Sequence, residues 1–219
     1  DFMKQNPALP LSNNNAMQVK IVGDKMGIAV NRFLRANGHR KIAQQSKWEY
    51  QLVNNNAVNA FCMPGGKIVF FNGIMPLAQD ESGIATIMGH EMAHAVARHG
   101  NERLSQQLAV ALGGVSLAIA MRDKPEQTRN LFLAVYGVGG TLGTLAYSRK
   151  HEYEADKLGM VFMAISGYDP AEAIKFWERM EQHQRSAQVP QFLSTHPHHS
   201  SRITEMKKFL PKAKKYLKN

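Results

Sequence analysis

Two histidines and a glutamate are grouped near the middle of the chain in a pattern that can hold a metal ion. His90, Glu91 and His94 form His-Glu-x-x-His, with Met92 and Ala93 as apolar spacers. On a helix, residues four apart share one face, so both imidazoles can reach one ion. Glu91 would project toward the open side of that ion, where a carboxylate can take a proton from bound water. Paired imidazoles suit Zn²⁺, so the pattern predicts metal-assisted hydrolysis rather than a helix that merely exposes two histidines.

A second polar run, residues 148–156, offers the third protein ligand that a catalytic zinc needs. Glu152 and Asp156 are four apart and share a helix face. Glu152 can therefore bind the metal while Asp156 accepts a hydrogen bond from the far nitrogen of a ligand histidine. Glu154 points elsewhere and is expected in solvent, and His151 is predicted to be a surface or core histidine rather than a ligand.

The elements that must position these groups can be predicted from hydrophobic periodicity and turn residues. Helices are expected over 16–37, 80–99, 101–121, 130–167 (in two parts, because of its glycines), 169–185 and from Ser200 or Ser201 onward. The segment 188–200 is expected to be a loop. Strands are expected over 48–53, 58–63 and 67–72, which predicts a small antiparallel sheet. The predicted fold class is α+β, mostly helical, with this sheet beside the helix that carries the two histidines.

The composition allows one sizeable core and gives the chain a positive charge. Of the 219 residues 44% are hydrophobic, which argues against a disordered protein. The net charge is +10, and part of it is local to Lys207, Lys208, Lys212, Lys214, Lys215 and Lys218. This run predicts a solvated, frayed tail or attraction to an anionic membrane face. No nucleic-acid partner is expected, because no RNA- or DNA-binding motif is present. Cys62 is the single cysteine and is predicted to be a small buried hydrophobe.

Three parts are expected along the chain: an irregular N-terminal segment (1–15), one catalytic domain (16–210) and a basic tail (211–219). Two apolar stretches, 108–121 and 131–147, need a membrane test. Both are shorter than the ~20 residues of a spanning helix. They are therefore predicted to be buried core helices.

The combined motifs resemble family forty-eight of the zinc metallopeptidases. They are the His-Glu-x-x-His pattern, Glu-Tyr-Glu-Ala-Asp from Glu152, and Thr195-His196-Pro197 with Arg202. The run from Asn59 through Gly66 resembles a further signature of that family. The family includes the CAAX prenyl proteases, bacterial HtpX and BepA and the mitochondrial protease of the Oma type. The resemblance covers about residues 16–210.

This resemblance implies a gluzincin-type, zincin-like fold with one Zn²⁺ per chain. It implies that His90, His94 and Glu152 are the zinc ligands and that Glu91 is the general base. It also implies that strand 58–63 is the edge against which substrate lies, through Asn59, Ala60 and Phe61. An edge strand suits this role because its unpaired backbone groups can add an extended peptide.

His196 and Arg202 admit several roles. By the same resemblance, His196 can be a fourth ligand that silences the enzyme by displacing water. Swung away, its ring could donate to the oxyanion, and a loop histidine without a metal role is the third alternative. Arg202 could bind Asp156 or the substrate carbonyl, or form a plain surface ion pair.

The predicted function is zinc-dependent endopeptidase activity on protein or peptide substrates, in misfolded or envelope proteins, with zinc-bound water as nucleophile and Glu91 as base. His196 would autoinhibit it. One rival is a zinc-binding pseudo-protease that acts as a chaperone or assembly factor, and another is a basic membrane-surface protein with a structural metal site. Contacts with a membrane or with outer-membrane assembly are expected. A periplasmic or envelope location is expected, as a mature protein or lipoprotein, in preference to the cytoplasm.

Overall fold

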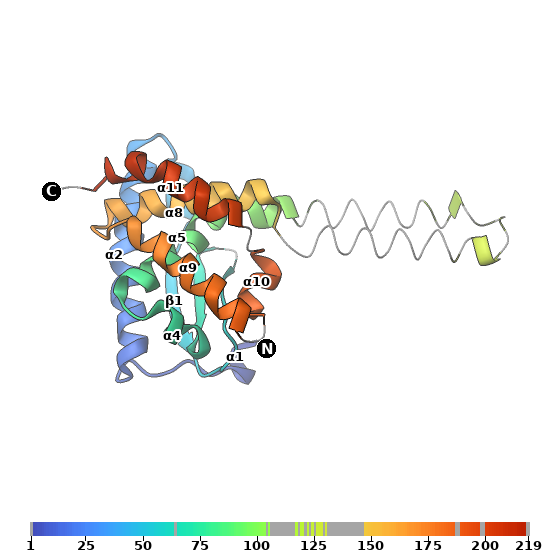
Figure 1. Cartoon of the computed structure of the whole chain (residues 1–219), viewed down its shortest axis with the longest axis horizontal. Helices are drawn as coiled ribbons and strands as arrows, with labels where there is room; N and C mark the ends of the chain where they lie inside the picture. Colours follow the sequence, from blue (N-terminus) through green and yellow to red (C-terminus); the bar gives the residue numbers. More distant parts are fainter. Residues whose placement is uncertain are drawn as a thin grey trace.

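The computed structural model describes residues 2–63, 65–103, 147–186, 189–197 and 200–217, with isolated positions between 105 and 130. The elements are α1 (Phe2–Gln5), α2 (Asn14–Ala36), α3 (Arg40–Gln45), β1 (Glu49–Val53), β2 (Ala60–Met63), β3 (Lys67–Phe71), the 3₁₀ turn η1 (Asn72–Ile74), α4 (Met75–Ala78), α5 (Glu81–Val96), α8 (Arg149–Ile165), α9 (Ala171–Ser186), α10 (Gln191–Thr195) and α11 (Ser200–Lys214). Figure 1 shows helices packed around a small sheet. The predicted α+β, mostly helical class is confirmed.

Helix α5 lies at the centre of the molecule, with α8 and α11 above it and α2 beside it in Figure 1. It contacts α2, α4, α8, α9 and β2. Every residue from Gly83 to His94 is buried, as expected for a helix that is covered on all sides. Its start is fixed by Asp80, whose carboxylate accepts a hydrogen bond from the Gly83 N–H at 2.9 Å.

The C-terminal end of α5 differs from the prediction. The helix was expected to reach residue 99, but it ends at Val96. Arg98 then adopts a left-handed backbone with φ of 60°, which turns the chain. Residues 97–99 contain neither glycine nor proline, so the local sequence carries no signal for a helix end at Val96. The turn is stabilised instead by tertiary contacts of the residue that follows it, His99.

Helices α5 and α8 pack closely against each other. A Cβ added to Gly159 would lie 3.0 Å from the backbone N of His90, and one on Gly89 would lie 2.9 Å from the Gly159 carbonyl oxygen. Only glycine permits so close an approach of two backbones. Thr86 contacts Met163 at one end of this seam, while His94 contacts Glu152 at the other. The two helices are therefore antiparallel.

Helix α8 begins abruptly at a capping serine. The Ser148 hydroxyl accepts a hydrogen bond from the His151 N–H at 3.3 Å, so the helix predicted over 130–167 has a start at Arg149. The apolar stretches 108–121 and 131–147 lie almost entirely outside the described residues. Within the described ranges, no helix combines the length and apolar character needed to cross a bilayer.

The sheet has three strands in the order β1-β3-β2 and is mixed rather than antiparallel. β2 pairs antiparallel with β3, as predicted, but β1 pairs parallel with β3. The prediction of antiparallel pairing throughout assumed that β1 and β2 are neighbours. β3 lies between them because it is the most apolar strand, with four of its five residues buried. A central strand is covered on both edges and both faces, so the most apolar sequence takes that place.

The two edges of the sheet have different environments. The N-terminal segment covers β1: the Leu9 N–H donates to the Leu52 carbonyl at 2.8 Å, and Ala8 forms a bridge with Val53. β2 forms the other edge and packs beside α5. The prediction that the second strand is an edge strand is confirmed. A single strand edge is thus left facing the helix that carries the two histidines.

The predicted helices 16–37, 169–185 and the one from Ser200 or Ser201 onward are confirmed with small shifts of their ends, whereas most of the predicted helix 101–121 lies outside the described residues. α2 is capped by Asn13, which accepts from the Ala16 N–H at 3.1 Å, and it is followed by Gly38 in a left-handed conformation. Asp169 accepts from the Ala171 N–H at 2.9 Å and starts α9. The predicted loop 188–200 contains α10, a short helix that the sequence did not indicate.

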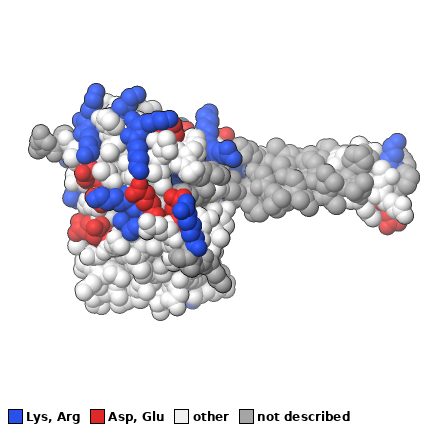
Figure 2. Space-filling model, viewed as in Figure 1, with Lys and Arg blue, Asp and Glu red and all other residues white. Residues whose placement is uncertain are grey.

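The basic C-terminal run is helical up to Lys214 rather than frayed. Lys207 lies 2.7 Å from Glu178 and Lys214 lies 3.8 Å from Asp169, so α11 is tied to the α9 region by ion pairs. Figure 2 shows Lys and Arg side chains gathered over the upper part of the molecule, with acidic side chains among them. Part of the local positive charge is therefore neutralised within the fold.

Candidate metal centre

Four side chains bring one ligand atom each to a common point. His90 Nε2 lies 3.1 Å from both His94 Nε2 and His196 Nδ1. Glu152 Oε1 lies 3.4 Å from His94 Nε2 and 3.2 Å from His196 Nδ1. All four atoms lie within 4.8 Å of one another, and all four residues are buried. The two histidines of α5 and the glutamate of α8 are thus brought together as predicted, with His196 as a fourth member.

The four separations of 3.1–3.4 Å are close to those around a tetrahedral ion. Bonds of about 2.0–2.1 Å to nitrogen or oxygen place the ligand atoms of such an ion about 3.3–3.4 Å apart. His90 Nε2 faces two other ring nitrogens at 3.1 Å, and one proton cannot satisfy three converging lone pairs. A set of three imidazoles and one carboxylate is a donor set that suits Zn²⁺.

The far side of His90 is held by a buried charge pair. Its Nδ1 lies 3.1 Å from Asp156 Oδ1, as the sequence predicted. Arg202 grips the same carboxylate, with Nε donating to Oδ2 at 2.8 Å and Nη2 to Oδ1 at 2.6 Å. Burial lowers the pKa of His90, but its hydrogen bonds to Asp156 and Glu152 outweigh this and raise it to about 9. A metal ion that binds Nε2 must therefore displace a proton.

Arg202 also neutralises the carboxylate of Glu152. Its Nη1 lies 2.7 Å from Glu152 Oε2, and its guanidinium lies 3.8 Å from the centre of the Trp177 ring. Arg202 is fully buried, so it is not a surface ion pair. Burial raises the pKa of Glu152, but the Arg202 charge followed by His196 holds it well below its usual range. Glu152 therefore keeps a charged carboxylate whose other oxygen, Oε1, faces the cluster.

Glu91 lies beside the four ligand atoms without joining them. Its Oε1 is 3.4 Å from His196 Nε2, at ion-pair distance, and among the described residues this atom has no hydrogen-bond partner. Burial raises the pKa of Glu91, which the charges of His196 and His90 oppose. A buried carboxylate with a free oxygen and a raised pKa can accept a proton and return it.

Three aromatic residues of the site were not predicted from the sequence. Tyr147 stacks on His94 with ring centres 4.0 Å apart, His99 Nδ1 lies 3.0 Å from His94 Nδ1, and the Trp177 ring lies 5.6 Å from that of His90. None of them is at a helical spacing from a ligand, so no rule of periodicity could have found them. They enclose the two histidines of α5.

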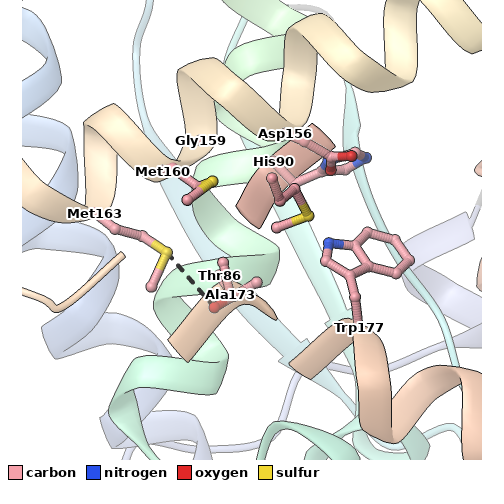
Figure 3. A pocket seen from close by; sticks show the side chains of 9 residues that line it. Thr86, His90, Asp156, Gly159, Met160, Met163, Ala173 and Trp177 are labelled. Carbon is pink, nitrogen blue, oxygen red and sulfur yellow. Dashed lines mark hydrogen bonds and ion pairs between the residues drawn. The ribbon is translucent and has the colours of Figure 1, made fainter. Parts of the chain in front are cut away.

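A small cavity of about 10 Å³ lies behind His90. Figure 3 shows His90, Asp156 and Trp177 at one end of it and Met163 at the other, with Thr86 between them. Its volume is sufficient for about one water molecule. It is too small for a peptide.

The other predicted site residues lie around β2 and α8. The Asn59 carbonyl accepts from the Phe71 N–H at 3.0 Å, and Ala60 and Phe61 begin the edge strand. His151 is buried and lies 3.1 Å from Glu102, outside the ligand set, as predicted. Glu154 is half-exposed and lies 3.6 Å from His99.

Comparison with known proteins gives one family. The model for peptidase family M48 matches residues 30–210. The chain is 38% identical over 168 residues to the mitochondrial metalloendopeptidase OMA1 of Schizosaccharomyces pombe, which is 76% of this chain and 48% of that protein. It is 36% identical over 210 residues to the protein of the same name in Saccharomyces cerevisiae, 93% of this chain and 59% of that protein.

A bacterial relative is more distant. The putative beta-barrel assembly-enhancing protease of Vibrio cholerae is 29% identical over 188 residues, 80% of this chain and 38% of that protein. The chain thus spans about half the length, or less, of these relatives. The expectation of a periplasmic or envelope location is wrong by this comparison, because the relatives with 36–38% identity are named as mitochondrial proteins.

Proposed function

The chain belongs to peptidase family M48, and on that premise we propose that it is a zinc-dependent endopeptidase acting on protein substrates. One observation carries the proposal: four ligand atoms from separate segments converge within 4.8 Å, and the free carboxylate oxygen of Glu91 lies next to them. A structural metal site has no need of a buried carboxylate with one oxygen left without a hydrogen bond, which costs stability. A hydrolytic site needs it as a proton carrier.

His90, His94 and Glu152 would hold the zinc. When bound, the ion supplies Lewis-acid chemistry that lowers the pKa of water and polarises a carbonyl group. Glu91 accepts the proton of the attacking water at Oε1 and passes it to the leaving amine. Asp156 keeps His90 oriented, and Arg202 keeps Glu152 charged. Both contacts are buried, so they do not depend on solvent.

The outer edge of β2 is suited to bind an extended peptide. The Phe71 N–H bonds to Asn59, so by the alternation of an antiparallel pair the backbone groups of Phe61 point toward β3. Those of Ala60 and Cys62 then point away from it. The Cys62 N–H acts on the Glu91 carboxylate and lowers its pKa, which places this edge beside the base. Backbone pairing here would position a peptide bond at Glu91 with little dependence on side chains.

His196 makes the described arrangement a closed, resting form. It is 2% exposed and lies at the end of α10, whose Phe192 N–H bonds to the Val58 carbonyl at 3.0 Å. The segment 189–197 thus covers both the cluster and the start of the substrate edge. Four protein ligands leave no open position on a tetrahedral ion. The segment must move for substrate to enter, and the freed ring of His196 could then donate to the oxyanion.

The rival function is a zinc-binding pseudo-protease that acts in membrane-protein assembly. The name of the Vibrio cholerae relative refers to beta-barrel assembly, but it also calls that protein a protease, so it does not favour the loss of cleavage. Such a protein would keep its metal permanently closed by His196 and would need no proton carrier. Contacts with a membrane or with outer-membrane assembly belong to this rival, since the edge strand and Glu91 do not require them.

The test is a zinc titration of the metal-free chain while the cleavage of casein is followed. We expect cleavage to rise in proportion to bound zinc and to saturate at about one ion per chain, because the four ligand atoms form one site. His39→Ala, which removes an exposed histidine remote from the site, serves as the control. Tight binding of one zinc without any cleavage, also in a His196→Ala variant, would favour the pseudo-protease.

A further inference from the structure

His99 is a buried histidine that neither the core nor the ligand set explains. It is 2% exposed, although it lies beyond the end of α5. Its Nδ1 lies 3.0 Å from Nδ1 of His94, on the side of that ring which faces away from the cluster. Burying an imidazole is costly unless its nitrogens are hydrogen-bonded. The pair His94–His99 is therefore a contact with a specific geometry.

The backbone before His99 is bent to make this contact. Arg98 has φ of 60°, one of two positive values among the described residues other than glycine. This conformation is unfavourable for a side chain with a Cβ and persists where the surroundings enforce it. It reverses the chain after α5 and returns His99 to the face of His94. The strained backbone at Arg98 therefore brings the segment that follows α5 into contact with the metal centre.

The protons can be assigned from the contacts. His94 must present a lone pair at Nε2 to the cluster, so its proton is on Nδ1. That N–H then donates to His99 Nδ1, which must be free of hydrogen. The proton of His99 is consequently on Nε2, which faces Glu154 Oε2 at 3.6 Å. The His94 N–H then meets an acceptor and the His99 N–H faces a carboxylate at ion-pair distance, whereas the reverse assignment would set two donors against each other.

The ring of His99 is also held in plane. His151 stacks on it with ring centres 4.4 Å apart and 20° between the planes. His151 is itself tied to Glu102 at 3.1 Å through Nε2. Two contacts in the plane and one across it leave the His99 ring little freedom to rotate. An orientation so fixed can be transmitted to His94.

We propose that His99 is a positioning residue for His94, which fixes the tautomer and ring orientation of that ligand, with Glu154 as the outer acceptor. His99 accepts a hydrogen bond from Nδ1 of His94, just as Asp156 does from Nδ1 of His90. The acceptor is a neutral imidazole in the first case and a carboxylate paired with Arg202 in the second. The inference rests on the proposed function, since it takes His94 as a zinc ligand.

The test compares His99→Leu, His99→Asn and the control His39→Ala. Zinc affinity is measured by competition with a chelator, and the visible absorption of the Co²⁺-substituted protein reports the ligand geometry. We expect His99→Leu to weaken zinc binding by about 10–100-fold, the usual effect of losing such a partner, and to alter the Co²⁺ spectrum. His99→Asn should recover most of the affinity, because its amide oxygen can accept in place of Nδ1.

Two outcomes overturn the inference alone: His99→Leu matches His39→Ala in affinity and spectrum, or His99→Asn fails as badly as His99→Leu while folded. If circular dichroism shows that His99→Leu does not fold, Glu154→Ala replaces it, because that side chain is 48% exposed. It should weaken zinc binding by a smaller factor, and no change would count against the proposal. Absence of zinc binding by the wild-type chain would instead overturn the proposed function.

Discussion

The seam between α5 and α8 has two halves that are equally buried and chemically opposite. In one half Gly89 meets Gly159, and Thr86 meets Met163. In the other, histidines of α5 face Glu152 and Asp156 of α8. The apolar half brings the two backbones to a fixed distance without polar demands. The polar half uses that distance to hold charge away from water, which is possible only because each charge has a partner.

The difference teaches that stability and chemistry are assigned to separate stretches of the same two helices. Close packing of small residues tolerates almost no change in volume. Buried carboxylates tolerate almost no loss of a countercharge. Substitutions in the two halves should therefore fail in different ways, and the following experiments separate them.

The largest effect is expected from Glu91→Gln, which removes the proton carrier and keeps the shape. Casein cleavage should fall by about 10²–10⁴-fold, the usual contribution of general acid–base catalysis. Zinc content should remain unchanged, because Glu91 is outside the ligand set. Burial raises the pKa of this carboxyl, so the neutral amide should leave the metal-free protein at least as stable. Cleavage at the wild-type rate would show that Glu91 is not the base.

Arg202→Leu tests the dependence of the polar half on its countercharge. Glu152 and Asp156 would both be left buried without the guanidinium that now lies 2.7 and 2.6 Å away. The free energy of unfolding of the metal-free protein should fall by about 3–5 kcal/mol. The free energy of unfolding of Arg202→Lys should lie between those of the wild type and Arg202→Leu, since an ammonium keeps the charge but cannot bond to both carboxylates as the planar guanidinium does. Chemical denaturation measures these values, and a loss below 1 kcal/mol for Arg202→Leu would contradict the account.

The two carboxylates that Arg202 neutralises, Glu152 and Asp156, predict that the stability of the metal-free protein depends on pH in the acid range. Burial raises the pKa of Asp156, but Arg202 outweighs this and lowers it, and Glu152 is lowered well below its usual range. A depressed folded pKa gives stability that is present above the ordinary carboxyl pKa and is lost as pH falls through the folded value. Wild-type protein should therefore keep this contribution above about pH 4, the ordinary carboxyl pKa, and lose it progressively as pH falls below that value. In Arg202→Leu this contribution should be absent, so the difference in stability between the variant and the wild type should shrink as pH falls, as followed by circular dichroism.

His196→Ala tests whether the polar half is closed by its fourth ligand. Removing this imidazole opens one position on the ion, so cleavage of casein by the zinc-loaded chain should rise while zinc binding weakens. The split between a higher rate and a lower affinity is the informative readout. A fall in rate at saturating zinc would instead support the oxyanion role of His196.

Gly159→Ala tests the apolar half. The new Cβ would meet backbone atoms of His90 and Gly89 at 3.0 and 3.1 Å, so the helices must separate slightly. We expect a cost of about 1–3 kcal/mol from overpacking, reduced by up to about 1 kcal/mol of gained helix propensity. Gly100→Ala is the matched control, because among the described residues its Cβ would meet Tyr147 alone, at 3.9 Å. Thermal unfolding of both variants distinguishes packing from propensity.

The smallest effect sets the baseline. Lys20 and Asp24 form an exposed ion pair one turn apart on α2. Lys20→Ala should change the free energy of unfolding by less than about 0.5 kcal/mol, because solvent screens such a pair. A larger change in the free energy of unfolding would mean that exposed ion pairs also stabilise the protein strongly. The contrast between the two halves of the seam would then not be specific to buried charges.

Much of the site followed from spacing within single helices. The interval from His90 to His94 and that from Glu152 to Asp156 place each pair on one face, because the rise and turn of an α-helix are fixed by its backbone. In the structure, Asp80, Asn13 and Asp169 fix helix starts for an equally local reason, since each caps an N–H two or three residues away. The edge position of the second strand was also expected, through the family resemblance.

The remainder depends on packing between segments that are far apart in sequence. No local rule states that β3 lies between β1 and β2, because pairing partners compete for burial rather than for sequence proximity. The early end of α5 is likewise decided by His99 returning to His94.

The sequence by itself determined which side chains share a helix face and which chemistry they can perform together. Only the tertiary structure decided that the two faces meet, that Arg202 neutralises both carboxylates and that His99 completes the contacts of His94. The physical reason is that geometry within a helix is set by covalent bonds and regular hydrogen bonds. Distances between helices are set by the volumes that pack between them, here by the near contact of Gly89 and Gly159.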